Sequence, residues 1–186
     1  FALGRFDEAW EAYSWRNRNP ENPNTVPSYP IPYWQGEDLS DLSILVWTEQ
    51  GPGETFLFSS MLNEIIAAAK KCTLITTARL RPILARSFPN ADVFDGDAYR
   101  VTSDTADVQS SLIDLSRWLR RSWSDFPTLP PHIKPDPVRV SKSQQLSGHK
   151  NGNPPTVGVA WNSLNVTNAS LKSLSLEALH PILSVP

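Results

Sequence analysis

The sequence has 186 residues and a 40% hydrophobic content, enough for one domain of ordinary size with a well-packed core and some additional chain. The net charge of −2 is small and spread along the chain, which excludes binding to nucleic acid or to an anionic membrane that is driven by electrostatic attraction. The single cysteine, Cys72, excludes an internal disulfide, and its place at the start of an apolar run predicts a buried strand thiol. No membrane span, signal peptide or metal site is expected, and both ends are expected to be cut from a longer protein.

The first residues predict a helix followed by an extended connector. Phe6, Trp10 and Tyr13 recur at helical spacing, so residues 6–16 are expected to form a helix with one aromatic face. Such a short helix is unstable alone in water, so this face requires a neighbour. Residues 17–32 are rich in Asn and Pro, which excludes regular helix and a central strand there.

The next segment predicts strands and helices in alternation. The strands are expected at residues 43–48, 72–77 and 91–94, with helices at 55–71 and 78–88 between them. This order predicts right-handed crossovers and an α/β fold, a Rossmann-like parallel sheet with flanking helices.

The remainder predicts shorter elements separated by loops. The expected elements are a fourth strand at residues 106–111, a helix at 112–123, a polar linker at 141–155, a strand at 156–161 and a helix at 175–183.

The turn after the first strand carries the clearest chemical signal. Gly51 and Gly53 are expected to allow positive φ and a close backbone approach, and the following helix offers unpaired N–H groups. Ligands of open parallel sheets sit at this edge. Glu54 can therefore accept a proton from a hydroxyl nucleophile, or it can simply stabilise the start of the helix.

Two other groups of residues leave alternatives open, and a third shows no signal. Arg117, Arg120 and Arg121 can face a phosphate or a solvated helix surface. Tryptophans in the first part of the chain can stack on a sugar or pack in the interior; they are Trp10, Trp15 and Trp34. The three histidines, His132, His149 and His180, lack the spacing of metal ligands.

Several motifs together resemble the glycosyltransferase-like domain that follows tetratricopeptide repeats in bacterial proteins. They are residues 34–37 (WQGE), 49–54 (EQGPGE), 58–60 (FSS), 85–91 (ARSFPNA), 119–122 (LRRS), 125–127 (DFP), 157–161 (VGVAW) and 172–176 (KSLSL). Residues 4–16 resemble the last repeat helix and its exit. The similarity covers nearly the whole chain, and this family is similar to heptosyltransferases and, more distantly, to O-linked N-acetylglucosamine transferases.

The resemblance implies a GT-B architecture, in which two Rossmann-like domains hold acceptor and nucleotide-sugar donor. The implied divisions are a repeat end at residues 1–18, a connector at 19–42, an N-terminal GT-B domain at 43–140, a linker at 141–155 and the start of a truncated C-terminal domain at 156–186.

The resemblance also implies roles for particular residues. Glu54 occupies the position of the candidate base, where the family usually has Asp, and Lys172 occupies a position near the donor phosphate, where the family usually has Arg. The implied substrate-binding residues are Gln50, Gly51, Gly53, Thr55, Trp161, Lys172 and Ser173.

Two functional hypotheses follow. In the first, the chain is part of a cytoplasmic enzyme that transfers a sugar from a nucleotide-sugar donor to a hydroxyl acceptor, protein or glycan, without a metal or other cofactor. The fragment alone is then expected to be inactive. In the second, the chain is a scaffold with a decayed site, and repeats before it bind a protein partner. Substitutions at three motif positions favour the second hypothesis: Glu54, Lys172 and Asn162, which replaces a glycine after the tryptophan-bearing strand.

Overall fold

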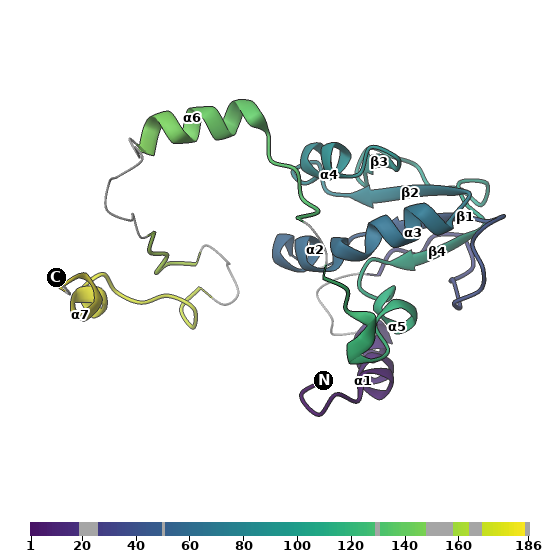
Figure 1. Cartoon of the computed structure of the whole chain (residues 1–186), viewed down its shortest axis with the longest axis horizontal. Coiled ribbons are helices and arrows are strands. Elements are labelled where there is room, and N and C mark those ends of the chain that lie inside the picture. The colour runs from purple at the N-terminus through teal and green to yellow at the C-terminus, as the bar shows by residue number, and fades with distance from the viewer. Residues whose placement is uncertain (19–25, 50, 129–130, 148–157, 164–168, 185–186) are drawn as a thin grey trace. The chain divides into compact units, whose positions relative to one another are not determined.

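The computed structural model describes residues 1–18, 26–49, 51–128, 131–147, 158–163 and 169–184. The described chain divides into two compact units, Phe1–Arg139 and Val140–Pro186. The first unit contains a sheet of four parallel strands in the order β3-β2-β1-β4 (Figure 1). The strands are β1 (Ser43–Trp47), β2 (Lys71–Thr76), β3 (Asp92–Asp95) and β4 (Val108–Ser111). The predicted α/β fold with a Rossmann-like parallel sheet is therefore confirmed.

Helices connect and flank these strands. The α-helices of the first unit are α1 (Phe6–Ser14), α2 (Pro52–Phe58), α3 (Leu62–Ala68), α4 (Arg81–Ser87) and α5 (Ser116–Leu119). Short 3₁₀ turns are η1 (Trp15–Arg18), η2 (Ser59–Met61) and η3 (Trp123–Asp125). The first crossover helix starts at Pro52 rather than Thr55, because proline fits the first helical position well.

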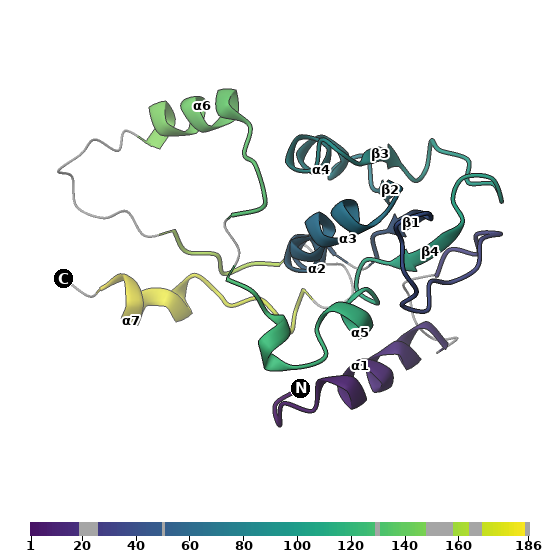
Figure 2. The same ribbon diagram turned by 45° about the vertical axis from the view of Figure 1, so that its right-hand side comes forward.

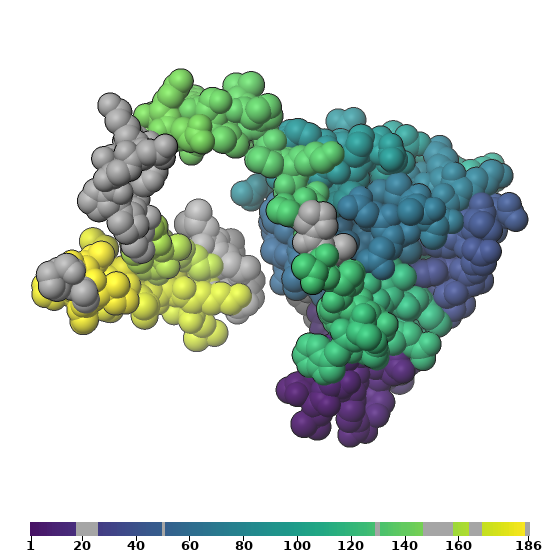
Figure 3. Space-filling view, viewed as in Figure 1, coloured from purple at the N-terminus to yellow at the C-terminus, as the bar shows by residue number. Residues whose placement is uncertain are grey.

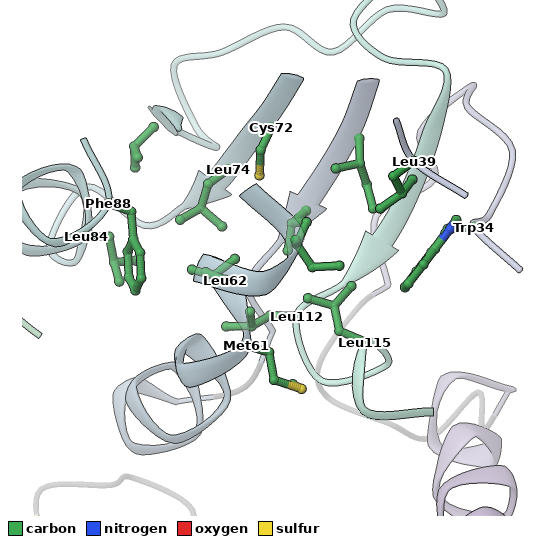
Figure 4. Close-up of a cluster of buried hydrophobic side chains, with 14 of the residues drawn as sticks. Trp34, Leu39, Met61, Leu62, Cys72, Leu74, Leu84, Phe88, Leu112 and Leu115 are labelled. Atoms are coloured by element: carbon green, nitrogen blue, oxygen red, sulfur yellow. The ribbon is translucent and has the colours of Figure 1, made fainter. Parts of the chain in front are cut away.

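The central strand β1 is buried on both faces. Ile44 and Val46 belong to the larger core cluster with residues of α3 and α4, whereas Leu45 and Trp47 belong to a second cluster on the opposite face. Figure 4 shows part of the larger cluster, with Leu62 and Met61 beside Leu74 and Leu112. The continuous apolar run of β1 follows from this double coverage. Cys72 also lies in the larger cluster, and burial, with a smaller contribution from Asp92, raises the pKa of its thiol to about 12. The predicted buried thiol is thus confirmed.

The connector extends the sheet beyond β4. Gln109 N donates to the Pro32 carbonyl at 2.8 Å, and Trp34 N donates to the Gln109 carbonyl at 2.8 Å. The buried Gln109 side chain donates to the Ile31 carbonyl at 2.6 Å and accepts from Trp47 Nε1 at 3.1 Å. Around Pro32 and Trp34 the predicted connector is therefore held by backbone bonds to an edge strand, and proline tolerates such an edge position. Residues 19–25 of the connector lie outside the described residues.

Helix α1 packs against the chain that follows β4, beside α5 (Figures 2 and 3). Phe6 and Trp10 are buried, and Tyr13 is half-buried, so the predicted aromatic face does have a neighbour. Trp10 Nε1 donates to the Arg120 carbonyl at 2.7 Å. The predicted helix over residues 112–123 is interrupted there, because Arg120 leaves helical geometry and its carbonyl bonds to α1 instead.

The second unit differs most from expectation. Residues 158–161 form no strand, and Thr156 and Val157 lie outside the described residues. A strand requires a hydrogen-bonded neighbour, and the described residues of this unit contain no other strand. Residues 177–183 form the predicted helix as η4 (Glu177–Leu179) and α7 (His180–Leu183).

Part of the predicted linker is helical, since α6 spans Pro137–Ser147. Asp136 Oδ1 accepts from the backbone N–H groups of Val138 and Arg139 at 2.9 and 3.2 Å. Asp followed by Pro is a helix start signal that the polar composition of the segment concealed.

Candidate functional site

The carboxyl ends of β1 and β4 meet at one edge of the sheet. The strand order changes direction between these two strands, because β2 and β3 follow β1 on one side and β4 lies on the other. Ligands of open parallel sheets bind at such a switch point, outside the carboxyl ends. Glu49 follows β1 closely, and Asp114 follows β4. These two carboxylates therefore flank the position where the fold offers a ligand crevice.

The guanidinium of Arg16 occupies this position. Arg16 Nη2 and Nε donate to the two carboxylate oxygens of Glu49 at 2.5 and 3.1 Å, a bidentate pair. Arg16 Nη1 lies 2.9 Å from Asp114 Oδ1. Arg16 Nη2 also contacts Ser111 Oγ at 3.4 Å. The switch point between β1 and β4 is thus filled by a side chain of the same protein.

The cluster of Arg16, Glu49 and Asp114 is largely shielded from solvent. The side chains of Arg16, Glu49 and Asp114 are 12%, 6% and 17% exposed. Burial by itself lowers the pKa of Arg16, but the hydrogen bond to Glu49 and the charges of Asp114 and Glu49 raise it above its ordinary value. Arg16 therefore remains a cation that neutralises part of two buried anions.

The glycine turn lies next to this cluster in the sequence. Gly51 precedes α2 with φ of −93°, and among the described glycines only Gly4 and Gly36 have positive φ. Gly51 and Gly53 do not use the positive φ that glycine allows, because the helix already begins at Pro52. Gln50 lies outside the described residues.

The acidic residue of the turn is available to a ligand, whereas its neighbour is not. Glu54 is exposed in the first turn of α2 and forms no hydrogen bond or ion pair with another described residue. Thr55 is buried, and its hydroxyl donates to the Gly51 carbonyl at 3.1 Å. Of the two, only Glu54 presents a polar group that has no partner among the described residues.

Gly53 leaves open space at this turn. A Cβ added at Gly53 meets no atom within 4 Å, whereas one added at Gly36 clashes with the Trp118 ring. We expect Gly36→Ala to lower the free energy of unfolding by about 2 kcal/mol, because φ is +91° there and the ring has to move. Gly53→Ala is the matched substitution and should raise stability by about 0.5 kcal/mol through helix propensity. Urea unfolding measures both, and a destabilising Gly53→Ala would contradict the open turn.

The remaining predicted site residues lie in the second unit. Ser173 Oγ donates to Asn162 Oδ1 at 2.9 Å and accepts from Ser163 N at 2.9 Å. Leu174 N donates to the Trp161 carbonyl at 2.8 Å. Trp161 is 40% exposed, and Lys172 is also exposed. Hydrogen bonds therefore join the segment that contains Trp161 to the segment that contains Ser173.

Each of the three arginines near α5 is engaged in an ion pair. Arg117 contacts Glu11, Arg120 contacts Glu64 and Arg121 contacts Asp7. Arg120 is buried, so neither proposed role, phosphate contact or solvated helix face, describes it. Trp10 and Trp34 are buried and Trp15 is 58% exposed.

The described residues contain no cluster of His, Cys, Asp or Glu that could hold a metal ion. In the same parts of the chain, no helix has the length and apolar character needed to cross a membrane.

Fold and site define an α/β protein with a Rossmann-like parallel sheet and an internal arginine at its switch point. The sequence is 31% identical over 204 residues to Protein FlbA of Caulobacter vibrioides. That match covers 100% of this chain and 34% of FlbA, so the chain spans about a third of the length of this relative. No family model and no solved structure matches the sequence.

Proposed function

We propose that this chain is part of a longer protein that transfers a sugar from a nucleotide-sugar donor to a hydroxyl acceptor, with the Rossmann-like unit on the acceptor side. The observation that carries this proposal is the exposed Glu54 carboxylate, which has no partner among the described residues, at the ligand-binding edge of a parallel sheet. The motif resemblance to tetratricopeptide-associated glycosyltransferases supports it. A free thiol at Cys72 fits the reducing cytoplasm in which we expect the protein to act.

In the proposed reaction, Glu54 accepts the proton of the acceptor hydroxyl. The acceptor oxygen forms a bond to the anomeric carbon, while the bond from that carbon to the nucleoside diphosphate breaks and the diphosphate leaves with the electron pair. Lys172 and Ser173, with Trp161, contribute to the donor side, where a cation offsets the charge on the leaving diphosphate. Lys172 supplies this charge as a single ammonium, without the bidentate contacts of an arginine.

The test is a transfer assay with the whole protein. Uridine, guanosine and adenosine diphosphate sugars are each supplied with glycan and protein acceptors, and acceptor-dependent release of the nucleoside diphosphate is measured. We expect release with at least one donor class. Failure of every donor to bind by calorimetry, together with no release, would overturn the proposal.

The occupied switch point favours a second candidate, a scaffold without catalysis. Arg16 fills the crevice between β1 and β4 and is held by two carboxylates, so no substrate can approach there without displacing it. A scaffold would bind a protein partner but no nucleotide sugar. Donor binding measured by calorimetry therefore distinguishes the two functions.

A further inference from the structure

A cavity of about 320 Å³ lies at the carboxyl ends of β2 and β3, on the side of the sheet away from β4. None of its lining residues belongs to the turn at residues 51–55 or to the cluster of Arg16, Glu49 and Asp114. The volume lies at the lower end of the range of about 300–1,000 Å³ that is typical of small-molecule sites, so the cavity suits a small ligand. Its walls come from the turn after β2, the start of α4 and the chain from β3 to residue 99; they are Ala78, Arg81, Phe94, Asp95, Ala98 and Tyr99.

Backbone hydrogen bonds and ring stacking hold the walls of this cavity in place. Gly96 N donates to the Thr76 carbonyl at 2.8 Å, and Tyr99 N donates to the Asp95 carbonyl at 2.9 Å. The Phe94 and Tyr99 rings are stacked with centroids 4.0 Å apart, and both pack against the second hydrophobic cluster. The aromatic surface is therefore formed before a ligand arrives, which lowers the entropic cost of binding.

Two opposite charges line the cavity without forming an ion pair with each other. Arg81 Nε donates to the Val93 carbonyl at 3.1 Å, and its two Nη groups have no partner among the described residues. Asp95 Oδ1 accepts from Asp97 N at 3.3 Å, and its Oδ2 has no partner in the same parts of the chain. The Asp95 side chain belongs to a half-buried residue, so it is less hydrated than a fully exposed acid. The cavity therefore presents a guanidinium and a carboxylate that a ligand can pair.

A ligand that satisfies both groups carries an anion and a cation on one small skeleton. A carboxylate matches the paired N–H donors of a guanidinium, and an ammonium matches the carboxylate of Asp95. An apolar or aromatic substituent matches the stacked rings and the two alanine methyl groups of the lining. A purely anionic ligand is repelled by Asp95, and a purely cationic ligand is repelled by Arg81. A zwitterion with an apolar side chain fits all three features.

We propose that this cavity binds a free α-amino acid with an apolar or aromatic side chain. The α-carboxylate pairs with the Nη groups of Arg81, the α-ammonium pairs with Asp95, and the side chain lies against the Phe94 and Tyr99 rings. The site is independent of the proposed sugar transfer, because neither Glu54 nor any other residue of the glycine turn lines it. Binding is measured without donor or turnover, so failure of one proposal leaves the other standing.

The test is a binding measurement on the purified protein with phenylalanine, tyrosine, tryptophan, leucine and methionine. Saturation-transfer NMR detects contact between each amino acid and the protein, and calorimetry gives the affinity. Each amino acid is compared with its amine, which lacks the carboxylate, and with its carboxylic acid, which lacks the ammonium. We expect at least one amino acid to bind, with its amine and its acid each about tenfold weaker. Absence of binding by every amino acid, or equal binding of the analogues, would overturn the proposal.

Variants locate the binding. Arg81→Gln and Asp95→Asn should each weaken the amino-acid affinity about tenfold, because each removes one charge-assisted contact. Arg79→Gln and Asp97→Asn are the matched controls: both residues are charged, exposed and close in sequence, but neither lines the cavity, so the affinity should not change. Circular dichroism verifies folding of each variant.

A second readout distinguishes direct contact from a structural effect. Asp95→Asn should bind the carboxylic acid analogue at least as tightly as the amino acid, because the repulsion from the Asp95 carboxylate is gone. Arg81→Lys keeps the positive charge without the bidentate contact and should therefore bind the amino acid more tightly than Arg81→Gln does. Unchanged amino-acid affinity in folded Arg81→Gln and Asp95→Asn would place the ligand elsewhere and contradict the proposal.

Discussion

Replacement of Arg16 by alanine is expected to lower the free energy of unfolding by about 3–5 kcal/mol. The substitution leaves Glu49 and Asp114 as two acids with 6% and 17% exposed side chains and no cation between them. Removal of one partner from a buried ion pair costs more than the pair contributes, because the remaining charge stays desolvated. Urea unfolding monitored by tryptophan fluorescence measures the loss.

A control on the same helical segment isolates burial as the cause. Arg5 also pairs with a glutamate, Glu8, but both side chains are more than half exposed. Arg5→Ala should therefore leave the free energy of unfolding nearly unchanged, because solvent screens an exposed ion pair. Combining Arg16→Met with Glu49→Gln and Asp114→Asn should recover most of the lost stability, since no buried charge remains. Equal effects of Arg5→Ala and Arg16→Ala would show that the cluster is hydrated in solution.

Much of the fold could be predicted from local sequence signals. The apolar run of Ile44 to Trp47 has strand length and no polar interruption, and it indeed lies between two hydrophobic clusters. Elements that depend on hydrogen bonds to distant segments of the chain were harder to predict. The run at residues 156–161 has strand composition, yet its described part forms no ladder, because backbone pairing and not composition makes a strand.

The site was only partly predictable. The glycine turn could be assigned to the ligand-binding edge because parallel strands end on the same side. Arg16 could not be assigned, because its partner Glu49 is 33 positions away and no local pattern joins them. One signal was present: Glu49 lies at the end of a buried strand, two residues before Gly51, and an acid at such a position requires a cation.

Substitution of Glu54 by glutamine is expected to slow sugar transfer by the whole protein about 10²–10⁴-fold, with little change in stability. Glutamine keeps the shape of the side chain but cannot take a proton from the acceptor hydroxyl. Because Glu54 is exposed and unpaired among the described residues, the fold does not depend on its charge. The measurement is kcat with a saturating donor, accompanied by a thermal melt of each variant.

The control is Glu8→Gln, which removes an exposed acid from the first turn of α1 and should leave the transfer rate unchanged. Glu54→Asp keeps the carboxylate but shortens the side chain by one methylene, so it separates the effect of charge from that of side-chain length. Since the family that this chain resembles usually carries aspartate here, the aspartate variant should transfer at least as fast as the natural protein if the carboxylate acts as a base. A helix-stabilising role predicts a different pattern: aspartate and glutamine then alter the melting temperature by small amounts and leave kcat alone. A rate unchanged in Glu54→Gln would therefore remove the base from the proposed mechanism and leave the occupied switch point at Arg16 as evidence for a scaffold.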